Sequence, residues 1–187
     1  QDKSTIQKKM ITNRIELVDA FGRKHDYLRL SITDSCNFRC LYCMPDEPFK
    51  CSSSNQLMSS REIFEISKVF VQNFGINKIR ITGGEPLVRN DFESIIEQLS
   101  TLKTSIGVTT NGVLLHKYFD LLKQKEVKNL NISIDSLQED RFNYITKSNQ
   151  YQRVWQNIEE SIQRGFNVKL NVVIIKGFNE DEISDFV

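Results

Sequence analysis

The chain alternates between two patterns of apolar and polar positions. In five short runs, Ile, Val and Leu recur at about every second residue, which predicts β-strands. The longer segments between these runs place apolar residues three or four positions apart, which predicts amphipathic helices. Repeated strand–helix units favour an α/β fold with a parallel sheet and right-handed crossovers. The strands are expected at 28–33, 77–82, 105–111, 129–135 and 167–175.

The expected helices have recognisable start and stop signals. Ser59 and Glu62 form a capping-box pair in front of an apolar face, and Gly75 is placed to end that helix. The next helix opens at Asn90, where Asp91 and Glu93 suit the positive end of the helix dipole. Two more helices are expected over about 114–124 and about 152–164, the latter ending before Gly165.

One face of every expected strand is polar, which is unusual for a parallel sheet covered by helices. Because strand side chains alternate between faces, these polar groups share one surface. If the sheet curves into a barrel, this surface becomes a polar lumen with three cations, suited to a polar, anionic ligand. A half-solvated sheet with its polar face outward is the alternative. The polar positions are Arg29, Ser31, Thr33, Arg80, Thr82, Thr109, Asn111, Asn131, Ser133, Asp135, Lys169 and Asn171.

Composition and charge narrow the class of protein. The net charge is +1, which gives no sign of a nucleic-acid-binding arm, and no apolar run is long enough to cross a membrane. Free cysteines without an export signal predict the cytoplasm. Residues 1–13 are interpreted as a flexible lead before a core domain over 14–187. A helix that opens at Asn179 is left incomplete, so the chain is interpreted as part of a longer protein.

Three of the four cysteines lie within eight residues, directly after the first expected strand. Cys36, Cys40 and Cys43 form a Cys-x3-Cys-x2-Cys loop that offers three thiolates to one metal centre. A structural zinc site needs a fourth protein ligand, which would have to be Cys51, His25 or His116. An iron–sulfur cube held by three thiolates would instead leave one iron open for chemistry. Disulfide pairing would need an oxidising compartment. The spacing favours the iron–sulfur cluster, with zinc as the rival.

The cysteine loop, with Tyr42 before its last cysteine, resembles that of the radical S-adenosylmethionine (SAM) enzymes. The Gly-Gly-Glu-Pro turn at 83–86 is similar to the turn that receives the SAM amino group in that family, and paired glycines let a backbone approach a ligand closely. The resemblance implies a partial (β/α)6 barrel, here truncated after about five strands. It also implies a 4Fe–4S cluster held by the three cysteines, SAM chelating the open iron, and reductive cleavage of SAM to a 5′-deoxyadenosyl radical.

Within that family the sequence is most similar to the GTP 3′,8-cyclases of molybdenum cofactor biosynthesis, from about Leu17 to Val187. The likeness rests on the segments 78–87, 109–112 and 131–135, among others. The sequence differs from the family at two positions. Ser35 stands where the family often has Arg, and a cysteine at position 51 is unusual. The resemblance implies SAM contacts at Tyr42, Gly84 and Ser133 and GTP contacts at Arg29, Arg80, Thr109 and Lys169, with no catalytic residue beyond the cluster ligands.

The implied reaction converts GTP to (8S)-3′,8-cyclo-7,8-dihydroguanosine 5′-triphosphate, the first step towards molybdopterin. The family carries a second 4Fe–4S cluster in a C-terminal domain that contacts guanine. Because this chain has no residues for that domain, it is not expected to complete turnover alone. The implied partners are GTP, an electron donor and the downstream protein that forms cyclic pyranopterin, and the resemblance allows a homodimer.

Two alternatives stay open. The first is another radical SAM enzyme, such as a peptide-modifying maturase, although cations on the polar face suit phosphates better than a peptide. The second is a non-catalytic metal-binding or electron-transfer module without SAM. Zinc content and SAM binding would separate this module from an enzyme.

Overall fold

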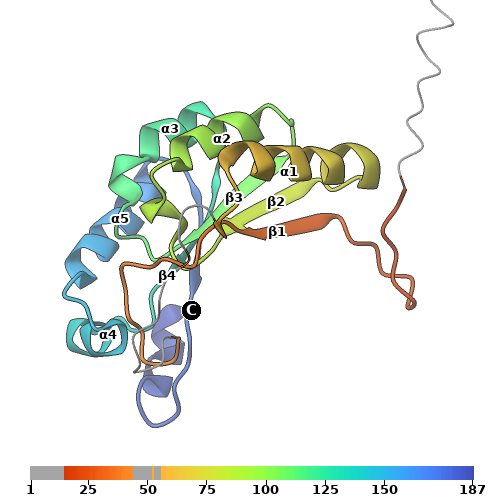
Figure 1. Ribbon diagram of the computed structural model, residues 1–187. Helices are drawn as coiled ribbons and strands as arrows, with labels where there is room; N and C mark the ends of the chain where they lie inside the picture. Colours follow the sequence, from red (N-terminus) through yellow and green to blue (C-terminus); the bar gives the residue numbers. More distant parts are fainter. Residues whose placement is uncertain (1–14, 44–51, 53–55) are drawn as a thin grey trace, which may run out of the picture.

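The sheet that organises the chain contains five parallel strands. In the computed structural model, which describes residues 15–43, 52 and 56–187, the strands follow one another in the sheet as they do in the sequence (Figure 1). The α/β fold and the partial barrel predicted from the sequence are confirmed. The expected lead at 1–13 and Cys51 lie outside the described residues. The strands are β1 (Tyr27–Ser31), β2 (Lys78–Thr82), β3 (Ser105–Thr110), β4 (Asn129–Ser133) and β5 (Asn167–Asn171).

Helices lie along one face of this sheet, so that face is covered and the other is left to the polar side chains (Figure 1). The α-helices are α1 (Ser60–Phe74), α2 (Phe92–Ser100), α3 (Phe119–Gln124), α4 (Glu139–Thr146) and α5 (Tyr151–Gln163). Short 3₁₀ helices are η3 (Pro86–Val88), η4 (Leu115–Lys117) and η5 (Glu180–Phe186). None of the helices in the described part of the chain has the length and apolar character that crossing a membrane would require.

Helix α1 begins and ends where its sequence signals predict. The Ser59 hydroxyl accepts a hydrogen bond from the Glu62 backbone N–H, and the Glu62 carboxylate accepts one from the Ser59 N–H at 2.8 Å. Gly75 takes a left-handed conformation, with φ of 70°, at the end of the helix. The local signals therefore determine both ends of this element.

The core lies between the sheet and the helices. Every second strand residue faces this layer, and full burial of an aliphatic side chain stabilises the fold by about 1.5–3 kcal/mol. The opposite face keeps the polar residues, as the two-residue period predicts. Buried core residues include Leu30, Ile81, Val108 and Leu130 from the strands and Ile63, Ile95, Leu99, Leu122 and Ile158 from the helices.

Four elements, α4, β4, β5 and η5, show clear differences from the sequence prediction. Helix α4 was not expected, because its apolar face is carried mainly by Phe142 and Ile145; Phe142 packs edge-on against Phe38 with ring centroids 5.8 Å apart. The strands β4 and β5 end at Ser133 and Asn171, four residues or fewer before their predicted ends. The last expected helix is present as the 3₁₀ helix η5, whose Glu182 is buried against α4 rather than exposed.

Asn157 on α5 provides a test of how the turn after β3 is held. Its buried side-chain amide donates to the carbonyls of Gly112 at 2.7 Å and Val113 at 3.1 Å. Asn157→Ala leaves both carbonyls without this donor, so we expect the free energy of unfolding to fall by about 1–3 kcal/mol in urea denaturation. Gln156→Ala, at the exposed neighbouring position, should change it by less than about 0.5 kcal/mol. Equal losses in the two variants would contradict this account.

Candidate functional site

The cysteine loop follows β1 and is fastened to the end of α4. The backbone N–H of Arg39 donates to the Thr146 carbonyl at 3.1 Å, and that of Leu41 donates to the Ile145 carbonyl at 2.9 Å. Inside the loop, the Arg39 guanidinium donates to the Cys36 carbonyl at 2.6 Å. The helix that the sequence did not reveal is therefore the support on which this loop rests.

The three thiols of the loop lie within electrostatic reach of one another. Burial raises the pKa of Cys36, and it raises that of Cys40 to about 12, with neighbouring thiol and carboxylate charges adding to the effect. Cys36 and Cys40 are half-buried, whereas Cys43 is exposed, and all three are free thiols. Without a cation the Cys36 and Cys40 thiols hold their protons, so metal binding there would release protons and would depend on pH.

The donor set suits an iron–sulfur cluster better than zinc. A zinc ion draws its sulfurs to within roughly 4 Å of one another, because Zn–S bonds are about 2.3 Å long. Within residues 15–43, 52 and 56–187, no three His, Cys, Asp or Glu side chains are gathered closely enough to hold one metal ion. His25 lies 3.7 Å from the Asp19 carboxylate instead, and His116 is exposed in η4. Among the described residues the loop offers three thiols and no fourth ligand beside them, which is the donor set that a cluster with one open iron would require.

Tyr42 connects the cysteine loop to the far side of the sheet. Its hydroxyl donates to Asp135 Oδ2 at 2.6 Å, and Asp135 Oδ1 accepts from the Val173 backbone N–H at 2.9 Å. Burial and the Asp135 carboxylate together raise the pKa of Tyr42, so the phenol keeps its proton. Asp135 is buried just after β4, so one carboxylate joins the cysteine loop to the ends of β4 and β5.

The paired glycines after β2 are required by a close crossing of the backbone. The Gly84 N–H donates to the Thr33 carbonyl at 2.6 Å, and a Cβ on Gly84 would lie 2.4 Å from the Ser35 carbonyl oxygen. A Cβ on Gly83 would meet the Thr33 carbonyl oxygen at the same distance. Any side chain here would displace the segment that leads into Cys36. A substitution at Gly84 would therefore damage the cysteine loop as well as a nearby ligand pocket.

Glu85, the next residue, is a buried carboxylate with three donors. It accepts hydrogen bonds from the Leu87 N–H at 3.0 Å, the Thr110 hydroxyl at 2.8 Å and the Asn111 N–H at 2.6 Å. Burial nevertheless raises the pKa of Glu85 to about 7, against the opposing effect of these bonds. The carboxylate thereby ties the turn after β2 to the turn after β3.

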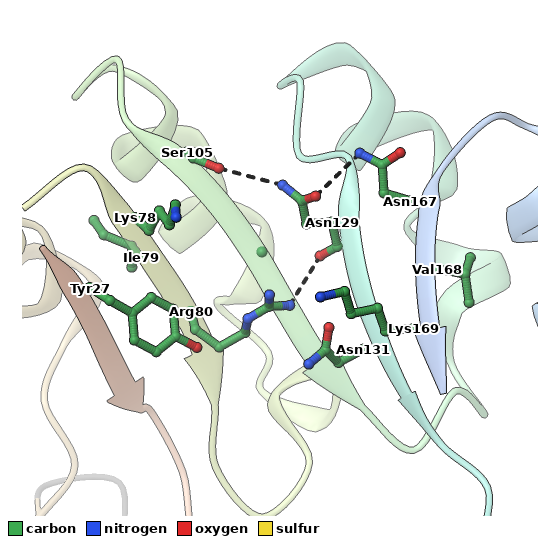
Figure 2. Close-up of a pocket in the computed structure, with 11 residues that line it drawn as sticks. Tyr27, Lys78, Ile79, Arg80, Ser105, Asn129, Asn131, Asn167, Val168 and Lys169 are labelled. Carbon is green, nitrogen blue, oxygen red and sulfur yellow. Dashed lines mark hydrogen bonds between the residues drawn. The ribbon is translucent and has the colours of Figure 1, made fainter. Parts of the chain in front are cut away.

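A cavity of about 410 Å³ lies on the polar face of the sheet, toward the amino ends of the strands (Figure 2). Lys78, Arg80 and Lys169 line it together with Asn129 and Asn131, and no Asp or Glu is among its lining residues. The cysteine loop instead follows the carboxyl end of β1. Because a strand of five residues is roughly 16 Å long, a ligand reaching both places would have to be elongated along the strands.

Arg80 crosses the sheet inside this cavity. Its Nη1 donates to the carbonyls of Val108 at 3.3 Å and Asn129 at 3.4 Å, while its buried Nε has no hydrogen-bond partner among the described residues. Gly107 makes this course available, since a Cβ there would lie 2.7 Å from Arg80 Nη1. Figure 2 shows Arg80 reaching over β3 and Lys169 pointing toward it. A guanidinium that lines a cavity beside a second cation is suited to an anionic ligand.

The structure brings together some of the site residues expected from sequence. Arg80 and Lys169 share the cavity, whereas Arg29 is not among its lining residues and donates weakly to the Thr82 hydroxyl at 3.5 Å. Thr109 is half-buried and paired in register with Asn131, which is itself beside Lys169. Of the residues expected to contact SAM, Tyr42 is in the cysteine loop, Gly84 is beside Ser35, and Ser133 is the half-buried last residue of β4.

Lys78 is a cavity residue that the sequence reasoning missed. It is the first residue of β2 and lies two positions before Arg80, so the two-residue period places both side chains on the same face. The alternation that identified Arg80 would also have identified Lys78 if it had been followed back to the start of the strand.

Sequence comparison finds a consistent set of relatives. A profile described as the Radical SAM superfamily matches residues 30–187. The chain is 47% identical over 174 residues to "GTP 3′,8-cyclase, mitochondrial" of Arabidopsis thaliana, covering 91% of this chain and 44% of that protein. It is 46% identical over 174 residues to "GTP 3′,8-cyclase" of Listeria welshimeri, covering 91% and 52%. "Molybdenum cofactor biosynthesis protein 1" of Drosophila melanogaster is 43% identical over 183 residues, covering 97% and 32%. The chain thus spans about half, or less, of the length of these relatives.

Solved structures share the fold at low sequence identity. The crystal structure of Streptococcus suis SuiB bound to precursor peptide SuiA superimposes with a TM-score of 0.70 at 16% identity, covering 98% of this chain and 39% of that chain. Methylornithine synthase (PylB) gives a TM-score of 0.61 at 13% identity, covering 89% and 47%. At these identities the likeness concerns the arrangement of strands and helices.

The buried Glu85 predicts an unusual pH dependence of stability. Its pKa is raised from 4.5 to about 7 in the folded chain, so folding stabilises the neutral form. The unfolded chain loses this proton first as the pH rises, so the free energy of unfolding should fall between about pH 4.5 and pH 7, by up to about 3 kcal/mol. Glu85→Gln should abolish this slope in urea denaturation at a series of pH values.

The other described groups with a resolved pKa shift titrate outside this window. The carboxyls whose pKa values are lowered, such as Asp91 and Asp181, titrate below it. The Cys36 thiol responds to the Glu85 charge, but its own pKa is raised well above the window. Stability that is flat or rising from pH 5 to pH 7 in the unmodified chain would show that Glu85 stays ionised.

Proposed function

This chain belongs to the radical SAM superfamily, and from that premise we propose that it is the radical SAM domain of a GTP 3′,8-cyclase. Its relatives at 46–47% identity carry that name, and the chain resembles them over 91% of its length. The proposed reaction converts GTP to (8S)-3′,8-cyclo-7,8-dihydroguanosine 5′-triphosphate in molybdenum cofactor biosynthesis.

The observation that carries the proposal is the convergence of cations in the cavity of the polar face. Lys78, Arg80 and Lys169 come from β2 and β5, and no carboxylate lines the cavity to neutralise them. Arg80 lines the cavity and its Nη1 makes only long hydrogen bonds, to the Val108 and Asn129 carbonyls at 3.3 and 3.4 Å, so its guanidinium keeps donor capacity for a ligand. A triphosphate provides several acceptor oxygens, and the guanidinium can bind two of them at once. We assign these three residues to the phosphates, with Arg29 and Thr109 as further contacts on the same face.

The opposite end of the polar face suits the cofactors. The proposed 4Fe–4S cluster would be held by Cys36, Cys40 and Cys43, and SAM would lie near Tyr42, Gly84 and Ser133. When bound, the cluster would supply the electron for the reductive cleavage of SAM. The chain's own residues orient the substrate: with the phosphates held at the amino ends of the strands, the ribose of GTP would extend toward the cysteine loop.

The remaining features of the proposal are implied by the family rather than by the described residues. In keeping with the family, we expect a second 4Fe–4S cluster to contact guanine, and we expect this chain alone not to complete turnover. An electron donor and a downstream protein that forms cyclic pyranopterin are the proposed partners. We retain the cytoplasm as the predicted compartment, and a homodimer is compatible with the proposal.

The cluster provides a direct test of the proposed cofactor. Anaerobic reconstitution with iron and sulfide should give about four irons per chain. Cys36→Ala, Cys40→Ala and Cys43→Ala should each abolish binding, because three thiolates are the minimum set, whereas Cys51→Ala should not. Iron, sulfide and zinc analysis measures the outcome. Stoichiometric zinc without iron uptake in anaerobic protein would favour the metal-binding module instead.

Nucleotide affinity tests the proposed substrate. Arg80→Ala and Lys169→Ala should each weaken GTP binding roughly ten- to hundredfold in calorimetry, because each removes a charge-assisted contact of about 1.5–3 kcal/mol. Lys123→Ala, an equal charge change at an exposed position on α3, should leave the affinity unchanged. ATP should bind nearly as tightly as GTP, since the expected guanine contacts lie elsewhere. Absence of any triphosphate affinity would favour the peptide-modifying alternative.

A further inference from the structure

Asn111 makes hydrogen bonds through its backbone N–H and through both polar atoms of its side chain. Its backbone N–H donates to Glu85 Oε2 at 2.6 Å, and its side-chain oxygen accepts from the Val113 N–H at 3.1 Å. Its side-chain Nδ2 donates to Asn37 Oδ1 at 2.6 Å and lies 3.9 Å from Cys36 Sγ. The residue is 8% exposed, so water competes little with these contacts.

These contacts join three segments that follow three neighbouring strands. Glu85 belongs to the turn after β2, Asn111 to the turn after β3, and Cys36 to the loop after β1. Asn157 holds the same turn from behind, through the Gly112 carbonyl. The Asn111 amide is therefore fixed on one side by the core and directed on the other side at the first cysteine of the loop.

Cys36 is the cysteine for which the structure provides N–H donors. Its Sγ also accepts from the Phe38 backbone N–H at 3.4 Å, so two N–H groups face this sulfur. For Cys40 and Cys43, no N–H donor to the sulfur is found among the described residues. The three proposed cluster ligands are thus unequal, and the difference depends partly on one replaceable side chain.

We infer that Asn111 is a positioning residue that donates an N–H···S hydrogen bond to Cys36 and thereby sets the reduction potential of the cluster. The inference rests on the proposed function, since it requires the cluster. Hydrogen bonds to cysteine sulfur are among the factors that set the potentials of iron–sulfur clusters.

The direction of the effect follows from charge. When a low-potential donor delivers one electron, negative charge on the cysteine sulfurs increases, so an N–H donor stabilises the reduced cluster more than the oxidised one. Removing the donor should lower the potential. A neutral hydrogen bond contributes about 1 kcal/mol, so we expect roughly a three- to tenfold smaller equilibrium constant for reduction, or about 30 to 60 mV for a one-electron couple.

The test uses variants of Asn111 that remove its contact with the Cys36 sulfur but keep the hydrogen bond with the Val113 N–H in the turn after β3. In Asn111→Ser the hydroxyl can still accept from the Val113 N–H but is too short to reach Cys36. Asn111→Asp keeps the oxygen acceptor, removes the donor and adds a negative charge, so it should lower the potential further. Midpoint potentials of the reconstituted chain are measured without SAM or GTP, by redox titration monitored by electron paramagnetic resonance.

Asn37→Ala is the matched control. It removes the acceptor of the 2.6 Å bond from Asn111 but retains both the Asn111 amide and the Cys36 thiol. Its potential should stay close to that of the unmodified chain. A shift in Asn37→Ala as large as that in Asn111→Ser would overturn the inference, because it would show a general disturbance of the loop.

Iron content completes the comparison. The Asn111 variants should retain the iron content of the unmodified chain, and a full iron complement with an unchanged potential would refute the inference. Loss of iron from both variants would also refute it, since Asn111 would then act only in building the loop. If the unmodified chain itself takes up no cluster, the proposed function fails, which is a different result from a cluster whose potential ignores Asn111.

Discussion

The two-residue period of the β-strand is the constraint on which the rest of this structure depends. Because successive side chains point to opposite faces, each strand can present an apolar row to the helices and a polar row to the other side. Leu30, Ile81 and Val108 fill the core, while Arg80 and Lys169 are kept out of it. A sheet with apolar residues on both faces would have required helices on both sides and would have left no polar surface for a ligand.

The carboxyl ends of the strands are then drawn together by short backbone contacts. Gly83 and Gly84 let the chain after β2 pass directly against Thr33–Ser35, and Glu85 extends this contact to the turn after β3. The cysteine loop is consequently held on one side by these turns and on the other by α4. Within the loop, Phe38 adds an apolar anchor, since it is buried and packs edge-on against Phe142 of α4.

The two ends of the polar face have opposite character. The amino ends of the strands gather cations around a cavity, whereas the carboxyl ends gather thiols, a buried carboxylate and amides. Gly107 is important to the first end because the absence of a side chain lets Arg80 reach across β3. An elongated anionic substrate and a cofactor could thus be held at different depths of one surface, which is the arrangement that the proposed reaction requires.

Local signals in the sequence were sufficient to predict much of this fold. The capping box at Ser59 and the alternation in the strands each depend on residues close together in the chain, and the structure confirms both. The spacing of the cysteines is equally local, and the ligand set predicted from it stays a prediction. Helix α4 was missed because its stability comes from distant contacts, such as that between Phe142 and Phe38, rather than from a strong apolar face. Lys78 was missed although the alternation included it.

The sequence by itself determined which side chains share a face and which chemistry the loop can offer, because both follow from short-range geometry. Only the tertiary structure decided which of these groups meet. The bonds of Glu85 with Asn111, Asn111 with Cys36 and Tyr42 with Asp135 join residues that are 26, 75 and 93 positions apart. The course of Arg80 over Gly107 likewise depends on the pairing of β2 with β3. No local period carries information about such contacts, since they depend on how strands pair and on where the turns between them come to lie.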